Sequence, residues 1–243
     1  MSAAPSPPTP SSTSARVRRF ALAVAFALLL PPVLAGAAGW EKVASERGVR
    51  VYIREVPGRD VPRFKGVATI DADPLLLLAV LADVERACEW NAACVHARMV
   101  QKRSEFDLDF HNRLKATWPV SDRDAVLRTS ARIEDGGNRV YAEFRAIQSA
   151  PAVAKGVVRF PMLHGRYTIR RNAKGGSNVE YVIDADPGGW VPNWFVKYAV
   201  KNVPLDTLTG LRRQAAKRAA DYAGFVARHR SPPPPPPAPP HAP

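Results

Sequence analysis

Few residues of this sequence are of the types that build metal or covalent catalytic centres. The 243 residues include two cysteines and five histidines, and the histidines show no ligand spacing. A structural zinc site needs about four ligands of these types. The sequence also contains no nucleophile elbow, phosphate-binding loop or dinucleotide fingerprint. We therefore expect no metal, no cofactor and no enzymatic activity.

The first 37 residues have the pattern of a processing signal. Three arginines precede the apolar run Phe20–Leu30, and the small residues Ala35–Ala37 follow it. The run is too short to span a membrane, which takes about 20 apolar residues. The pattern predicts a disordered start and a secretory signal peptide cleaved near Ala37, which would place the protein in the periplasm or outside the cell.

The two cysteines, Cys88 and Cys94, are predicted to form a disulfide. An exported protein folds in an oxidising compartment, where such bonds form and persist. The loop between them is short, so the bond is expected to stabilise the fold by about 2 kcal/mol.

Positive charge predominates along the chain. There are 35 Lys and Arg against 22 Asp and Glu, a net charge of +13, and loss of the three N-terminal arginines leaves +10. No RNA-binding aromatic motif, zinc spacing or recognition helix accompanies this charge, which argues against a nucleic-acid partner. Transient contact with an anionic membrane surface and plain solubility both account for it.

The foldable part is predicted to be one monomeric domain, residues 38–230. The stretch 231–243 is almost entirely proline and is expected to be a disordered tail, because such a run cannot build a core. The roughly 190 residues that remain suit a single domain with a sizeable core.

The first half of this domain contains both strand and helix signals. Trp40–Arg47 has the pattern of a short helix start. Alternating apolar residues over Val49–Ile53 and Phe64–Ile70 predict a hairpin of two strands. Asp73 followed by proline predicts a capped helix start, and the nearly all-apolar run Leu75–Val84 predicts a buried helix.

A long amphipathic strand is predicted from Phe106 to Trp118. One face carries Phe106, Leu108, Phe110, Asn112, Leu114, Ala116 and Trp118, and the other Asp107, Asp109, His111, Arg113 and Lys115. This alternation indicates a sheet with one buried and one wet face. Further strands are predicted at Val126–Ile133, Val140–Ala146, Val157–Phe160, Tyr167–Arg171 and Val179–Ala185.

The C-terminal part changes to helical periodicity. Asn193 is predicted to cap a short helix, Trp194–Lys201, and Pro204 to start a long helix that reaches about Arg228. Its apolar stripe comprises Leu205, Leu208, Leu211, Ala215, Ala219, Tyr222 and Val226. The sum predicts an α+β fold in which a curved antiparallel sheet packs on a long C-terminal helix. If side chains do not fill the space between them, an apolar cavity remains, which is the default ligand site.

Three segments resemble the START family, the steroidogenic acute regulatory protein-related lipid-transfer domains. They are Val80–Val84 with Trp90, Trp118–Asp124, and Asp186–Trp194 with Pro204 following. Their order and spacing match the family over nearly the whole predicted domain. The resemblance implies a helix-grip fold in which a U-shaped sheet encloses a hydrophobic tunnel and the last helix forms its lid. It also implies binding of a sterol, phospholipid or other hydrophobic molecule, in most members without chemistry.

Ten residues are candidates for the tunnel and its lid. They are Phe106, Leu108, Phe110, Asn112, Leu114, Arg128, Trp194, Tyr198, Leu205 and Leu208. Asn112, a polar member of an apolar face, either orients a ligand hydroxyl or head group, or bonds a neighbour or water. Arg128 and Arg132 share one face of a strand and can hold a phosphate or carboxylate if that face is inward.

Two other groups each have two interpretations. The residues Asp122, Arg123 and Asp124 can contact a head group, but local pairing that fixes the turn is favoured. Near the lid stand Trp190, Trp194, Phe195, Lys197, Tyr198 and Lys201. Aromatic residues among lysines suit both docking at a lipid interface and packing on the sheet.

We predict a protein that carries or senses one lipid or sterol without catalysis. Ligand access is expected to require movement of Trp190–Leu211 about a hinge at Asn202–Pro204. Two alternatives remain: a cyclase-like or hydrolytic enzyme on the same fold, and an interaction module whose cavity is filled by side chains.

Overall fold

The computed structural model describes residues 39–148 and 151–230. The strands are β1 Glu41–Glu46, β2 Val49–Arg54, β3 Arg63–Ile70, β4 Cys94–Lys102, β5 Leu108–Leu114, β6 Asp122–Glu134, β7 Arg139–Ile147, β8 Val157–Arg159, β9 Met162–Arg171 and β10 Ser177–Asp186. The helices are α1 Pro74–Ala82, α2 Ala87–Trp90, α3 Asn193–Arg218 and α4 Ala223–His229, with short 3₁₀ turns η1 Val84–Arg86, η2 Asp135–Gly137 and η3 Ala220–Tyr222. The predicted signal peptide and proline tail lie outside the described residues.

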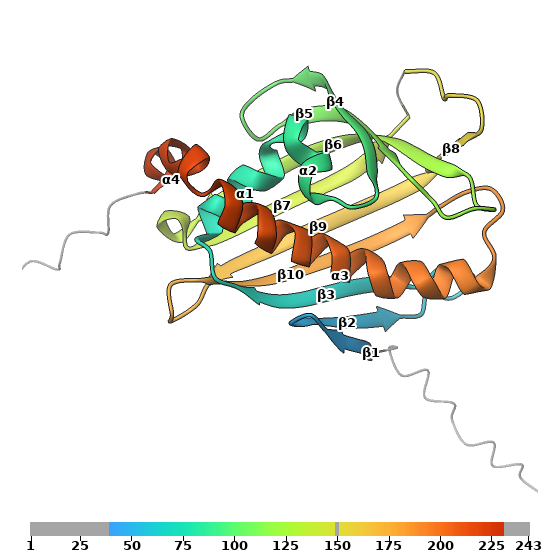
Figure 1. Cartoon of the computed structure of the whole chain (residues 1–243), viewed down its shortest axis with the longest axis horizontal. Coiled ribbons are helices and arrows are strands. Elements are labelled where there is room, and N and C mark those ends of the chain that lie inside the picture. The colour runs from blue at the N-terminus through green and yellow to red at the C-terminus, as the bar shows by residue number, and fades with distance from the viewer. Residues whose placement is uncertain (1–38, 149–150, 231–243) are drawn as a thin grey trace, which may run out of the picture. The chain divides into compact units, whose positions relative to one another are not determined.

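One sheet contains all the described strands, in the order β1-β2-β3-β10-β9-β7-β6-β5-β4, with β8 beside β6. All pairs are antiparallel except that of β6 with β8. Helices α1, α2 and α3 lie against one face of this sheet, and α3 runs across it (Figure 1). The predicted α+β helix-grip fold is confirmed.

The buried helix at the start of the domain forms as its sequence predicts. The Asp73 carboxylate accepts a hydrogen bond from the backbone N of Leu75 at 2.8 Å, and proline occupies the first turn. An aspartate at this position satisfies one of the backbone donors that a helix start leaves open. Leu75 and Leu77 are fully buried, so α1 contributes to the core on several sides.

The predicted helix at Trp40–Arg47 is wrong, because Glu41–Glu46 within this stretch form β1. Arg47 and Gly48 both have positive φ, 53° and 72°. A two-residue turn of this kind matches the twist of paired strands. It folds β1 back onto β2, from Glu46 opposite Val49 to Glu41 opposite Ile53.

The predicted break before Pro204 is also wrong, because α3 is continuous from Asn193 to Arg218 with Pro204 inside it. Asn193 is the first helical residue and Pro192 occupies the cap position, without a side-chain capping bond. Proline inside a helix removes one backbone hydrogen bond. Packing offsets this loss: Pro204 is buried, and a Cβ added to Gly66 of β3 would lie 2.9 Å from its Cβ.

The predicted long strand is shorter than its alternation suggests. Phe106 precedes β5 in a turn where Ser104 Oγ accepts from the backbone N of Phe106 at 3.3 Å and of Asp107 at 3.0 Å. Trp118 follows β5 in a loop and is 87% exposed. Among the described residues, no helix is both long enough and apolar enough to cross a membrane.

Candidate functional site

A cavity of about 660 Å³ lies between the sheet and the helices that cover it. Its volume falls within the range of small-molecule sites, about 300–1,000 Å³. Most of the wall is apolar, with contributions from Leu78 of α1, Phe110 of β5, Leu127 of β6, Phe144 of β7, Leu163 of β9, Ile183 of β10 and Val200 of α3. The interior is therefore not packed solid, which overturns the alternative of a module without a cavity.

Six of the ten predicted site residues line this cavity: Phe106, Leu108, Phe110, Asn112, Leu114 and Tyr198. The other four, Arg128, Trp194, Leu205 and Leu208, are not part of its wall. The alternation of β5 placed its apolar face correctly, because on a sheet covered on one side that face turns inward.

Arg128 lies on the opposite face of β6 from the cavity residues Leu127 and Thr129. Its Nε lies 2.9 Å and its Nη2 3.0 Å from the two carboxylate oxygens of Asp109, directly across β5 and β6. Arg103 adds a third bond at 2.7 Å. The expectation that Arg128 holds a ligand head group is therefore corrected: it is half of an ion pair outside the cavity.

The same contacts correct the expectation that Asp109 lies on a wet face. Asp109 is only 4% exposed, whereas Asp107 is half-buried, with 46% of its side chain exposed. The hydrogen bonds from Arg128 outweigh burial and lower the pKa of Asp109. Arg132 also points away from the cavity, with its guanidinium 5.3 Å from the ring centre of Tyr141.

Leu205 and Leu208 are fully buried in the core, not on the cavity wall. Leu208 packs so closely on β3 that a Cβ on Gly66 would lie 2.8 Å from its Cδ1. The residues of α3 that line the cavity include Val200 and Thr207. Trp194 is 50% exposed, and its ring contacts that of Phe195, which lines the cavity in its place.

Local pairing is confirmed for the acidic residues of the Trp118–Asp124 segment. Asp122 accepts from Arg113 at 2.8 Å, and Asp124 accepts from Arg159 at 2.7 Å and contacts His111 at 2.8 Å. Burial alone would raise the pKa of Asp124, but these bonds lower it. Both carboxylates therefore fix the start of β6.

Arg123, by contrast, lines the cavity, although it was not among the ten predicted site residues. It is 5% exposed and donates to the backbone carbonyls of Ser121, Pro187, Gly188 and Trp190. Burial lowers the pKa of Arg123. The side chain thereby ties the start of β6 to the loop that leads into α3.

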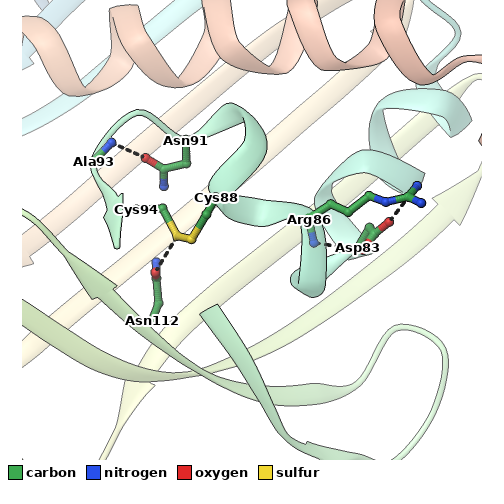
Figure 2. Close-up of a disulfide and its surroundings, with 7 residues drawn as sticks. All are labelled: Asp83, Arg86, Cys88, Asn91, Ala93, Cys94 and Asn112. Carbon is green, nitrogen blue, oxygen red and sulfur yellow. Dashed lines mark hydrogen bonds and ion pairs between the residues drawn. A yellow bond between two sulfur atoms is a disulfide. The ribbon is translucent and has the colours of Figure 1, made fainter. Parts of the chain in front are cut away.

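Cys88 and Cys94 form a disulfide with a Cα–Cα distance of 4.9 Å (Figure 2). Four of the five residues between the two cysteines, Trp90 to Ala93, line the cavity. Within the loop, Asn91 Oδ1 accepts from the backbone N of Ala93 at 3.2 Å. The disulfide therefore closes a part of the cavity wall.

Two stacked tyrosines, Tyr167 of β9 and Tyr181 of β10, also line the cavity. Their ring centres lie 4.3 Å apart at an interplanar angle of 11°. Burial raises the pKa of both hydroxyls, and Tyr181 interacts with Thr207 of α3. Both tyrosines therefore remain neutral at physiological pH. Tyr167 shares one face of its strand with Ile169, and Tyr181 shares one face with Val179 and Ile183. This alternation was a sequence signal from which the inward-facing tyrosines could have been found.

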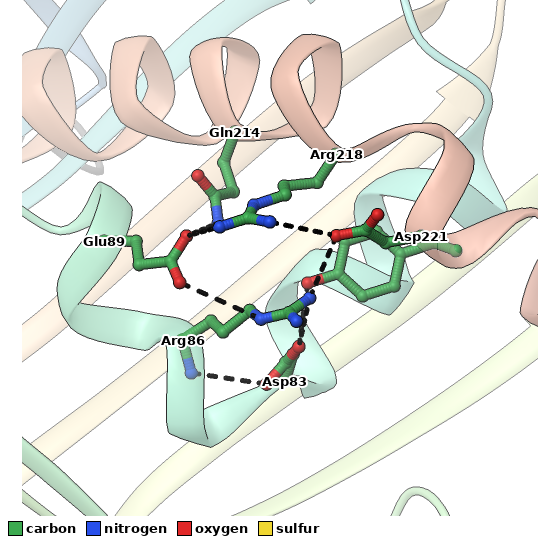
Figure 3. A network of polar contacts seen from close by, with 7 residues as sticks. Asp83, Arg86, Glu89, Gln214, Arg218 and Asp221 are labelled. Carbon is green, nitrogen blue, oxygen red and sulfur yellow. Dashed lines mark hydrogen bonds and ion pairs between the residues drawn. The ribbon is translucent and has the colours of Figure 1, made fainter.

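A polar network anchors the C-terminal half of α3 to the α1–α2 segment (Figure 3). Gln214, 1% exposed, donates to Glu89 at 2.9 Å, and Arg218 donates to the same carboxylate at 3.1 Å. Arg86 donates to Asp221 at 3.2 Å. The N-terminal half of α3, which covers the cavity, is held instead by separate ion pairs, Lys201 with Glu46 at 2.7 Å and Asp206 with Arg47 at 2.9 Å.

No group of three or more His, Cys, Asp or Glu side chains in residues 39–148 and 151–230 is placed to hold a metal ion. The charged residues gathered around β5 and β6 are instead engaged with one another, as Asp109 and Asp124 show.

Comparison with known proteins gives consistent matches. The START domain family matches residues 25–219. An uncharacterized Pseudomonas aeruginosa protein is 32% identical over 180 residues, which cover 74% of this chain and 88% of that protein. Phosphatidylcholine transfer protein of Bos taurus is 28% identical over 183 residues, 73% of this chain and 84% of that protein. A crystal structure of a STAR-related lipid transfer protein fragment from Xanthomonas axonopodis has 27% identity and a TM-score of 0.67, covering 73% of this chain and 99% of that one.

Proposed function

The chain belongs to the START domain family, and on this premise we propose that it binds one lipid or similar hydrophobic molecule in its cavity and carries or senses it without chemistry. The observation that carries the proposal is the apolar cavity of about 660 Å³ beneath α3. Burial of an apolar molecule favours binding by about 25 cal/mol per Å². The similar proteins from Bos taurus and Xanthomonas axonopodis are named as lipid transfer proteins, which supports the same function for this cavity.

Native mass spectrometry of the protein, purified without detergent and then extracted for lipid, tests this proposal. We expect one bound molecule per chain, drawn from one lipid class, because a single cavity of this size admits one ligand. The contrary result is a ligand-free mass that stays unchanged after incubation with a broad lipid extract.

Export is part of the proposal. The expected signal peptide lies in residues 1–37, and an oxidising compartment suits the disulfide between Cys88 and Cys94. A carrier there would exchange ligand with a membrane surface.

The cavity mouth is the surface that we propose to contact this membrane. Four large aromatic residues are exposed around it and at the start of α3: Trp118, Trp190, Trp194 and Tyr198, at 87, 65, 50 and 51%. Trp118 and Tyr198 also line the cavity, and exposed lysines at positions 115 and 197 stand beside them. Tryptophan favours the membrane interface and lysine favours anionic lipid. Ligand would then pass beneath the N-terminal half of α3, which Pro204 weakens by removing one helical hydrogen bond.

Replacement of Trp118 and Trp194 by alanine is expected to slow lipid transfer between vesicles about tenfold, because the interface loses two aromatic anchors. The measurement is the transfer rate of a fluorescent lipid from donor to acceptor vesicles that contain anionic phosphatidylglycerol. Val100→Ala, which removes an exposed apolar residue of β4 outside the cavity wall, serves as the control and should transfer at the normal rate. Equal rates for all three proteins would refute the assignment of this surface.

A further inference from the structure

The side chain of Asn112 presents an amide to the cavity without a full set of partners. Asn112 is 9% exposed and lines the cavity. Its Oδ1 lies 3.6 Å from Cys94 Sγ (Figure 2). A disulfide sulfur has no hydrogen to donate, so this contact does not satisfy the oxygen. Nδ2 has no acceptor among the residues that the structure describes.

Rotation of the Asn112 amide by a half-turn, which exchanges Oδ1 and Nδ2, does not change this conclusion. It would let Nδ2 donate weakly to the sulfur and turn Oδ1 away from it. One amide atom is left to the cavity in either orientation, as a donor in the first and as an acceptor in the second. A ligand hydroxyl satisfies this amide atom in both orientations, because a hydroxyl can donate and accept a hydrogen bond.

The other polar groups near Asn112 differ in whether they have a partner. Thr129 Oγ1 donates to the carbonyl of Leu108 at 3.2 Å. The indole Nε1 of Trp90, in the same part of the wall, is buried and has no acceptor among the described residues. Because that nitrogen is inaccessible, Asn112 is the group near the disulfide that offers a ligand an unpaired polar atom.

The charged residues of the cavity wall are either not buried or already engaged: Glu105, Lys115 and Glu143 are exposed and Asp206 is half-buried. The buried charged residues of the described chain are Asp109, Arg123 and Asp124, and of these only Arg123 lines the cavity. Four of the five N–H groups of its guanidinium are taken by backbone carbonyls. A buried ionised phosphate is strongly unfavourable without a matching, free cation. The cavity therefore disfavours a phosphate head group in its interior.

We infer that the cavity selects an uncharged lipid with a hydroxyl group, and that Asn112 binds this hydroxyl. The inference rests on the proposed function, since it names the ligand class of the same cavity. It separates this chain from the phosphatidylcholine cargo that its relative in Bos taurus is named for.

The test uses the full chain and matched fluorescent probes. They are a diacylglycerol and a sterol, each with a counterpart in which hydrogen replaces the hydroxyl, and a phosphatidylcholine with the same acyl chains as the diacylglycerol. We expect at least one hydroxylated probe to bind about tenfold more tightly than its counterpart, and phosphatidylcholine to bind at least tenfold more weakly than that probe.

Two variants then test whether Asn112 is the residue that binds the ligand hydroxyl. Asn112→Leu keeps the approximate size of the side chain and removes the amide, so the hydroxylated probe and its counterpart should bind equally. Thr129→Val removes a cavity hydroxyl that already has a partner, so the preference should remain.

Each result that contradicts the inference can be distinguished from the others. Phosphatidylcholine bound as tightly as the hydroxylated probes would overturn the ligand class while leaving lipid binding intact. A preference that survives Asn112→Leu would overturn the role of Asn112. Absence of binding to all five probes would refute the inference and the proposed function together.

Discussion

Ala142→Trp is expected to reduce lipid binding by more than tenfold while leaving the protein folded. Ala142 of β7 lines the cavity directly opposite Ala131 of β6, so an indole at this position projects into empty space. If the ring excludes the ligand from about 100 Å² of wall, binding loses about 2.5 kcal/mol. The measurement is the fraction of ligand-bound protein in native mass spectrometry, together with urea unfolding.

A matched control is available on the same strand. Arg145 is exposed and lies outside the cavity wall, so Arg145→Trp places the same ring on the outer face of β7. This variant should bind lipid normally. If Ala142→Trp also remained fully loaded, the cavity would not be the ligand site, and the proposed function would be refuted at this point.

Gly210→Ala is expected to lower the free energy of unfolding by about 2 kcal/mol, the opposite of the usual effect in a helix. Alanine in a helix interior is normally about 1 kcal/mol more favourable than glycine. At Gly210 of α3, however, an added Cβ would lie 2.1 Å from the carbonyl oxygen of Trp90 and 3.1 Å from its carbon. Because backbone cannot rotate away as a side chain can, the helix must shift, and overpacking of this kind costs about 3 kcal/mol.

Gly224→Ala provides the comparison for this substitution. Gly224 lies in α4, and its added Cβ would meet only Arg228 Nη1 at 3.7 Å. Urea unfolding should show Gly224→Ala to be neutral or slightly stabilising. If Gly210→Ala and Gly224→Ala had equal stability, α3 would not approach Trp90 as closely as the structure shows. Because Trp90 lines the cavity, we also expect Gly210→Ala to weaken lipid binding.

The difference between Leu208 and Thr207 shows where prediction of the site ended. Both belong to α3 and both are buried, but Leu208 packs on β3 whereas Thr207 faces the cavity. Helical periodicity indicates which face of a helix is turned away from water. It does not indicate whether that face packs on the core or borders an internal cavity, because both keep it away from water. The position of the empty space depends on the curvature of the sheet opposite, which no local pattern encodes.

Asp109 and Arg128 illustrate the same limit for polar residues. Strand alternation placed Asp109 correctly on the outer face, but the prediction that this carboxylate is solvated was wrong. Its burial comes from Arg128 of the neighbouring strand β6 and from Arg103, which directly follows β4. Such pairing is set by strand register and so becomes visible only once β4, β5 and β6 are assembled.

The sequence by itself determined the local elements whose causes are local. The Asp73 cap, the alternation of β5 and the apolar stripe of α3 each follow from neighbouring residues, and three ordered motifs were sufficient to indicate the family. Only the tertiary structure decided that β1 is a strand, that α3 continues through Pro204, and which buried residues border the cavity. The physical reason is that pairing, packing and empty space arise between segments far apart in the chain, such as Glu89 and Gln214.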